Sequence, residues 1–194
     1  RLLALALVVS GAAGCAVNKG ADLPDLSDWD ERSRVLAGID AYEFNGRIGV
    51  KTGEDGFNGK LRYAQAADDF SATVGGPLGI GTVRIEGNGD AVRLTDKDGI
   101  TTELADVEID LYVRYGWTIP VESLRYWALG IPDPGTPAET VFADSGELRE
   151  LSQGGWTVTI SRYAEAAGQS MPSRLKAENA GTSVRLVIDR WVFR

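Results

Sequence analysis

The chain has 194 residues, of which 43% are apolar and 25% are charged, a balance typical of a folded globular protein. Its formal net charge of −8 argues against a general electrostatic attraction to nucleic acid, so we expect no nucleic-acid partner. The sequence contains no histidine and one cysteine, which excludes a Ser-His-Asp triad, a histidine-ligated metal site and an intrachain disulfide. These absences remove most hydrolase mechanisms, and with the resemblance described below we expect a protein that is not an enzyme and that uses no cofactor or metal.

The first 14 residues have the pattern of a targeting segment. Arg1 precedes a short apolar run over residues 2–10, which is too short to span a bilayer and is followed by small residues. The sequence Ala12-Ala13-Gly14-Cys15 resembles a bacterial lipobox, in which the cysteine becomes the lipidated first residue of the mature protein. Acyl chains on Cys15 would anchor the protein stably to a membrane. The alternative is an ordinary signal peptide followed by an unmodified cysteine.

These features divide the chain into a lipoprotein signal peptide at residues 1–14, a lipidated tether at 15–28 and a single domain at 29–194. The tether contains Gly20 and Pro24 and has no apolar period, so we expect it to lie outside the core. A helix is predicted to begin at Ser27 or Asp28 and to end between residues 38 and 40, because apolar residues recur there at helical spacing.

From Tyr42 onward, apolar residues recur at every second position, which predicts strands with one buried face. The predicted strands are separated by short turns, and such turns force antiparallel pairing. They cover residues 42–51, 57–63, 70–74, 83–85 and 92–94. A loop over Pro132–Thr140 is predicted to precede further strands at residues 148–151, 156–160, around 175 and at 184–188.

The middle of the chain is predicted to be helical. Pro120 stands at the first turn of a helix that ends at Gly130. Residues 104–115 fit both the alternation of a strand and the stripe of a helix, and we favour the helix because of the resemblance described below. The order of helix, meander, helices and meander predicts an α+β fold.

Two enzyme-like patterns carry little weight. Gly79 and Gly81 begin like a dinucleotide-binding fingerprint, but Arg84 occupies the third glycine position and strands follow. The adjacent carboxylates Asp68 and Asp69 lie at a predicted turn, where such groups are usually solvated.

The loop between the third and fourth predicted strands is unusual. It places Pro77 and Leu78 among several glycines, and a core strand has no reason to contain this combination. Leu78 is either exposed at the loop tip or folded back onto the core, and the sequence alone favours neither.

Five short motifs together resemble the LolB family of outer-membrane lipoprotein receptors. The resemblance runs from about Trp29 to the carboxyl end, and the motifs occur in the order and at the spacings of that family. The motifs are Gly46-Arg47-Ile48-Gly49-Val50, Gly76-Pro77-Leu78-Gly79, Leu124-Arg125-Tyr126-Trp127-Ala128-Leu129-Gly130-Ile131-Pro132, Met171-Pro172 and Ile188-Asp189-Arg190-Trp191.

The resemblance implies a strongly curved antiparallel sheet, an open half-barrel, that is closed by helices around an apolar cavity. It implies a receptor that accepts acylated lipoproteins from the periplasmic carrier LolA and inserts them into the inner leaflet of the outer membrane. Such a receptor would bind the acyl chains of its clients, would act as a monomer, and would be anchored at the periplasmic face of the outer membrane through Cys15. The loop residues Pro77, Leu78 and Gly79 would act in the insertion step.

The inward faces of the predicted strands and helix supply candidates for the cavity lining. They are Phe44, Ile48, Leu61, Tyr63, Phe70, Val74, Val83, Leu94, Trp127, Val158 and Leu186. The same periodicity also fits a filled hydrophobic core. The alternative function is therefore a structural or assembly lipoprotein of the outer membrane that binds no acyl ligand.

Overall fold

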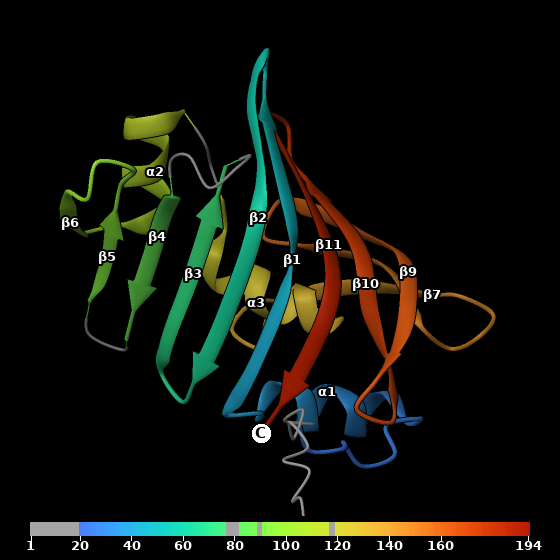
Figure 1. Ribbon diagram of the computed structural model, residues 1–194. Coiled ribbons are helices and arrows are strands. Elements are labelled where there is room, and N and C mark those ends of the chain that lie inside the picture. Colours follow the sequence, from blue (N-terminus) through green and yellow to red (C-terminus); the bar gives the residue numbers. More distant parts are fainter. Residues whose placement is uncertain (1–19, 77–81, 89–90, 117–118) are drawn as a thin grey trace, which may run out of the picture.

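The computed structural model describes residues 20–76, 82–88, 91–116 and 119–194 (Figure 1). Within these ranges it contains the helices α1 (Trp29–Ala37), α2 (Val107–Tyr115) and α3 (Val121–Leu129). The strands are β1 (Ala41–Thr52), β2 (Asp55–Ala66), β3 (Asp69–Gly75), β4 (Thr82–Gly87), β5 (Val92–Thr95), β6 (Thr101–Leu104), β7 (Ala138–Phe142), β8 (Leu148–Gln153), β9 (Trp156–Ala166), β10 (Gln169–Glu178) and β11 (Thr182–Phe193).

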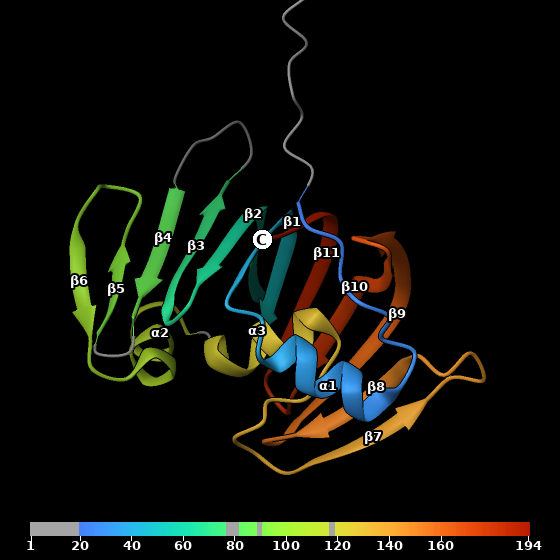
Figure 2. The same cartoon turned by 90° about the horizontal axis from the view of Figure 1, so that it is seen from below.

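All of these strands form one antiparallel sheet with the order β6-β5-β4-β3-β2-β1-β11-β10-β9-β8-β7. The sheet therefore consists of two meanders, β1 to β6 and β7 to β11, which are joined where the first strand pairs with the last. It remains open, with β6 and β7 as its edges. The sheet is curved, and α3 lies on its concave side (Figure 2).

The pairing of β1 with β11 depends on a close approach at Gly46. The register shifts between Asn45 and Gly46, as expected for a β-bulge. A Cβ atom at Gly46 would lie 2.0 Å from the carbonyl oxygen of Val187, so only glycine fits there without movement of the backbone.

The predicted helices are confirmed, and their ends follow from capping. The Asp28 carboxylate accepts a hydrogen bond from the Glu31 backbone N–H at 2.9 Å and begins α1. In the ambiguous segment 104–115, Leu104 ends β6, and Asp106 caps α2. Pro120 is the residue before α3 rather than part of its first turn.

Both edge strands differ from the prediction. The prediction of a loop over residues 132–140 is wrong for the last three residues, which belong to β7. Strand β6 was not predicted. The reason is the same at both edges. Most residues of β7 are exposed and β6 has only four residues, so neither shows a clear apolar alternation.

The described part of the expected tether, residues 20–28, lies against the sheet instead of outside the core. The Ala21 N–H donates to the Phe193 carbonyl at 2.8 Å, and the Leu23 N–H donates to the Ala167 carbonyl at 2.8 Å. Leu26 is buried in the core. The segment is held by backbone hydrogen bonds and by the apolar side chains of Leu23 and Leu26, which are too few to give an apolar period.

The core beneath β8 to β10 is densely filled. Trp127 of α3 packs against Trp156 of β9 with ring centroids 6.1 Å apart, and both rings are buried. The buried Gln153 accepts from the Trp127 indole N–H at 2.8 Å and donates to the Asp133 carbonyl at 2.8 Å. These contacts fix α3 and the segment that follows it on this side of the sheet.

Candidate functional site

An apolar pocket of about 230 Å³ lies between the first meander and the helices. It is lined by Phe44, Ile48, Phe57, Leu61, Tyr63, Ala72, Val74, Val83, Ile85, Leu94, Leu111, Ile119, Val121, Leu124, Arg125 and Leu186. The residues come from β1 to β5, β11, α2, α3 and the residues just before α3. We call this the apolar pocket below.

The strand alternation places the lining side chains on the concave face. Phe44 of β1 pairs with Tyr63 of β2, which in turn pairs with Ala72 of β3, so the three side chains lie side by side across the sheet. Ala72 and its β4 partner Ile85 are only half-buried, unlike Phe44 and Tyr63. At this level of the sheet the concave face is therefore less covered on β3 and β4 than on β1 and β2.

Tyr63 brings a polar group to the pocket wall, and its hydroxyl is hydrogen-bonded. The Tyr63 hydroxyl donates to the Gln65 side-chain oxygen at 2.5 Å, and the Gln65 amide donates to the Ala67 carbonyl at 2.6 Å. Burial raises the pKa of Tyr63 to about 12, so the hydroxyl is neutral at physiological pH. The phenol ring stacks on Phe44 at 5.0 Å and presents an apolar face.

Arg125 is the charged residue of the pocket lining. Its Nη2 donates to the Tyr126 hydroxyl at 2.6 Å, and its guanidinium carbon lies 4.5 Å from the centre of the Tyr126 ring. Its backbone carbonyl faces the Tyr42 hydroxyl at 3.5 Å. Among the described lining residues Arg125 carries the charge, and its guanidinium is engaged with Tyr126, which does not line the pocket.

Most of the predicted lining residues lie around this pocket. They are Phe44, Ile48, Leu61, Tyr63, Val74, Val83, Leu94 and Leu186. Trp127 and Val158 are fully buried and belong instead to the filled core beneath β8 to β10. Alternation and helical spacing do not separate these two residues from the others. Trp156, which lies two residues before Val158 on the same face of β9, packs against Trp127, so this side of the sheet is filled.

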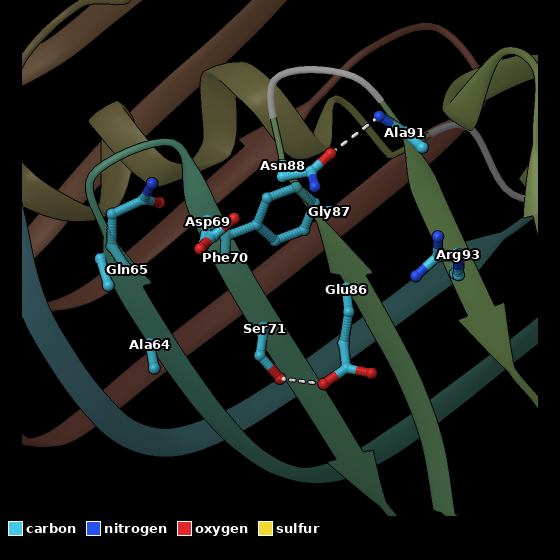
Figure 3. Close-up of a pocket in the computed structure, with 11 residues that line it drawn as sticks. Ala64, Gln65, Asp69, Phe70, Ser71, Glu86, Gly87, Asn88, Ala91 and Arg93 are labelled. Atoms are coloured by element: carbon cyan, nitrogen blue, oxygen red, sulfur yellow. Dashed lines mark hydrogen bonds between the residues drawn. The ribbon is translucent and has the colours of Figure 1, made fainter.

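Phe70 lies in a different hollow, at the end of β3 away from the 77–81 loop (Figure 3). Its ring packs over Gly87, where an added Cβ would lie 2.4 Å from the Phe70 ring. The same hollow is lined by polar residues, including Ser71 and Glu86, whose side chains are 3.5 Å apart. It is a mixed, open surface rather than an apolar enclosure.

Sequence reasoning missed Phe57, Ala72, Ile85, Leu111, Ile119, Val121, Leu124 and Arg125 of the lining. A signal existed for several of them. Ala72 and Ile85 continue the alternation of the predicted strands, and Val121 and Leu124 share one side of the predicted helix. No periodicity distinguishes Arg125 from a solvent-exposed arginine.

The remaining predicted site residues, Cys15, Pro77, Leu78 and Gly79, lie outside the described residues. The strands on either side of the loop are well defined, because Gly75 of β3 pairs with Thr82 of β4. Val74 and Val83 next to this pair both line the apolar pocket. The loop that contains Leu78 therefore connects two strands at the wall of the pocket.

The described ranges were searched for membrane-spanning helices and for clusters of metal ligands, and neither was found there. No helix there is both long and apolar enough to cross a membrane. In the same ranges no three Asp, Glu, His or Cys side chains come together as metal ligands would.

Comparison with known proteins gives consistent matches. The family model described as outer membrane lipoprotein LolB matches residues 40–191. The outer-membrane lipoprotein LolB of Nitrosococcus oceani is 36% identical over 164 residues, covering 84% of this chain and 82% of the relative. The protein of the same name from Pseudomonas aeruginosa PAO1 is 31% identical over 189 residues, covering 97% of this chain and 92% of the relative.

A solved structure supports the fold. The crystal structure of a LolA superfamily protein from Nitrosomonas europaea matches with a TM-score of 0.58 at 9% identity, covering 85% of this chain and 93% of that one. At that identity the match concerns the fold alone, an open antiparallel sheet with helices. The family model over residues 40–191 and the 36% identity to the Nitrosococcus oceani protein show that this chain belongs to the LolB family of outer-membrane lipoproteins.

Proposed function

We propose that this protein is an outer-membrane lipoprotein receptor, which accepts acylated lipoproteins from a LolA-like periplasmic carrier and inserts them into the inner leaflet of the outer membrane. Membership of the LolB family supports the role. The observation that carries the proposal is the apolar pocket on the concave side of the sheet, which is suited to acyl chains. The receptor acts as a monomer, needs no cofactor and catalyses no reaction.

The energetic task is to keep hydrocarbon out of water. A client with three acyl chains exposes on the order of forty methylenes, each worth about 0.8 kcal/mol, so it does not cross the periplasm unshielded. A receptor pocket that binds the chains more tightly than the carrier does makes the first transfer downhill. The membrane binds them more tightly still, which makes the second transfer downhill without nucleotide hydrolysis.

In this proposal α2 and α3 are the helical cover of an open half-barrel. Of the α2 side chains that the structure describes, Leu111 alone is fully buried, whereas Ile109, Tyr112 and Val113 are exposed. A helix held by so few buried contacts separates from the sheet at low cost. Movement of α2 away from the sheet would enlarge the apolar pocket. The enlarged pocket would then accept acyl chains that are too long for the pocket as the structure describes it.

We further propose that lipidated Cys15 anchors the receptor at the periplasmic face of the outer membrane and that the loop residues Pro77, Leu78 and Gly79 take part in insertion. Support comes from the position of the loop, which connects β3 and β4 beside the lining residues Val74 and Val83. An apolar side chain at this place would contact the bilayer next to the pocket and offer the acyl chains a path out.

The experiment is a two-step transfer assay. Purified carrier loaded with labelled lipoprotein is mixed with the receptor, and liposomes are added afterwards. The wild-type receptor is expected to take up the client and pass it to the liposomes. Leu78→Glu is expected to take up the client but to deliver it poorly, while the matched control Leu78→Met delivers normally. Failure of the wild type to take up client would refute the receptor role, and normal delivery by Leu78→Glu would refute the role of the loop.

The alternative of a structural or assembly lipoprotein requires a filled core and no acyl ligand. The filled region beneath β8 to β10 is compatible with it, but the hollow region beneath β1 to β5 is not. Native mass spectrometry of the purified protein distinguishes the two functions, because a receptor should retain a fatty acid or phospholipid added in solution.

A further inference from the structure

The convex face of the sheet, opposite the apolar pocket, gathers positive charge in a chain whose net charge is −8. Two pairs of cations lie directly opposite each other on neighbouring strands, Arg47 with Lys60 and Lys176 with Arg185. Arg47, Lys60 and Arg185 each precede a lining residue of the apolar pocket, so alternation turns their side chains to the convex face. Their strands β1, β2 and β11 lie side by side in the middle of the sheet (Figure 1).

This arrangement of cations costs stability. Like charges that lie directly opposite each other on neighbouring strands destabilise a sheet. Two of the four cations have an exposed acidic partner, Asp189 for Arg47 at 2.8 Å and Glu178 for Lys176 at 2.6 Å. Lys60 and Arg185 form no ion pair with any residue that the structure describes. Because acidic residues outnumber basic ones in the chain, the placement of these two cations points to an anionic ligand from outside it.

A shallow hollow between the cations offers room for such a ligand. It has a volume of about 380 Å³ and is lined by Arg47, Ile48, Gly49, Asn58, Gly59, Lys60, Gly75, Gly76, Arg185 and Val187. In the strand register Gly49 lies beside Arg185, and Gly75 lies beside Lys60. Glycine at these two positions leaves the backbone uncovered by side chains. An anionic group in the hollow would therefore lie among three cations, with no carboxylate in the described lining.

The hollow lies beside parts of the chain that are proposed to meet the membrane. Gly76 is in its lining and directly precedes the 77–81 loop. The first described residue, Gly20, lies against the carboxyl end of β11. Gly20 follows Cys15 by five positions, which span at most about 18 Å. A lipid anchor at Cys15 would therefore hold one end of β11, the strand that carries Arg185, close to the bilayer.

We propose that Arg47, Lys60 and Arg185 form a binding site for the headgroup phosphate of an anionic phospholipid, and that this site turns the convex face toward the bilayer. The inference rests on the proposed anchor at Cys15 and adds an orientation to it. An anionic bilayer repels the acidic chain as a whole but attracts a local cluster of cations within about 10 Å of its surface. The lipid anchor and the cationic hollow together would select one orientation of the receptor on the membrane.

The test is co-sedimentation of the full mature chain with vesicles, with Cys15→Ser in every sample so that no acyl anchor contributes. Vesicles of phosphatidylcholine are compared with vesicles that contain about 30% phosphatidylglycerol, at about 50 mM and about 500 mM salt. The chain with all its cations is expected to bind the anionic vesicles at least about tenfold more tightly at low salt and to lose this preference at high salt. Lys60→Gln combined with Arg185→Gln is expected to lose it at both.

Arg114→Gln combined with Arg149→Gln is the matched control. It changes the net charge equally, at exposed positions on α2 and β8 that lie outside the hollow, and should retain the preference. Thermal unfolding verifies that each variant is folded. Inorganic phosphate added at constant ionic strength should leave vesicle binding in place, whereas complete displacement would assign the hollow to free phosphate and overturn the proposal.

Equal binding to both kinds of vesicle, or equal binding of Lys60→Gln/Arg185→Gln and the control to anionic vesicles, would refute the headgroup site. The receptor function would then still stand, because uptake of a client from the carrier takes place in solution and is measured without vesicles. Lys60→Gln/Arg185→Gln is expected to take up the client like the wild type. Failure of the wild type to take up the client refutes the receptor function whatever the vesicles show.

Discussion

Filling the apolar pocket should abolish acyl binding without unfolding the protein, and Ala72→Phe is the substitution that does this most directly. Ala72 lies at the centre of β3, where it pairs with Tyr63 on one side and Ile85 on the other. All three residues line the pocket. The new ring would point from the sheet into the hollow, and the half-buried position gives it room to adjust.

The size of the effect follows from the pocket volume. With about 30 Å³ for a small group in a liquid, a pocket of about 230 Å³ holds roughly eight methylenes. The substitution adds six carbon atoms and so occupies most of this space. At about 0.8 kcal/mol for each methylene that is excluded, the chain would lose about 5 kcal/mol of binding free energy, on the order of a thousandfold in affinity. Burial of the ring should offset any strain and leave stability unchanged or higher.

The assay is displacement of a fluorescent fatty acid, with thermal unfolding measured on the same samples. Thr73→Phe is the matched control, because Thr73 is the next residue of β3 and lines a hollow on the opposite face of the sheet. We expect Thr73→Phe to bind like the wild type. Wild-type affinity in a folded Ala72→Phe variant would show that acyl chains bind elsewhere, and the reasoning from the pocket would be refuted.

Two further predictions concern stability. Trp127→Phe removes the N–H that donates to Gln153 and part of a buried ring, so the free energy of unfolding in urea should fall by about 2 to 3 kcal/mol. Dodecanoate affinity should not change, because Trp127 is absent from the pocket lining, and a marked loss would contradict the division between filled and hollow regions. Because burial raises the pKa of Tyr63 to about 12, the unfolded chain loses this proton first as the pH rises. The contribution of Tyr63 to stability should then be constant below about pH 10 and fall by up to about 3 kcal/mol between about pH 10 and 12. The total fall over this range should be smaller in Tyr63→Phe than in the wild type by up to this amount, and equal falls would argue against this cause.

Local structure was largely predictable because each element carries its own signal. Period-two alternation predicts which side chains of β1 and β2 face inward, and the cap residues Asp28 and Gly130 define where α1 begins and α3 ends. The two edge strands, β6 and β7, lacked such a signal because so few of their residues are buried. Resemblance to a family, rather than periodicity, favoured the helix at α2.

The sequence by itself determined which residues are turned inward, but it did not determine what lies opposite them. Phe44 and Val158 have the same alternating pattern, yet the former lines a pocket and the latter is packed in a filled core. The difference comes from elements far away in the chain. Trp127 and Trp156 occupy the space beneath β8 to β10, whereas beneath β1 to β5 Leu111 is the α2 residue that the structure places in the pocket lining.

Tertiary structure also decided that the two meanders form one sheet. The pairing of Tyr42 with Phe193 and of Thr52 with Thr182 joins the first strand to the last, and no local pattern specifies a contact at that separation. This pairing brings Leu186 of β11 beside the lining residues of β1. Alternation reports only the face of a strand, and so the existence of a hollow at that face depends on the packing of the whole chain.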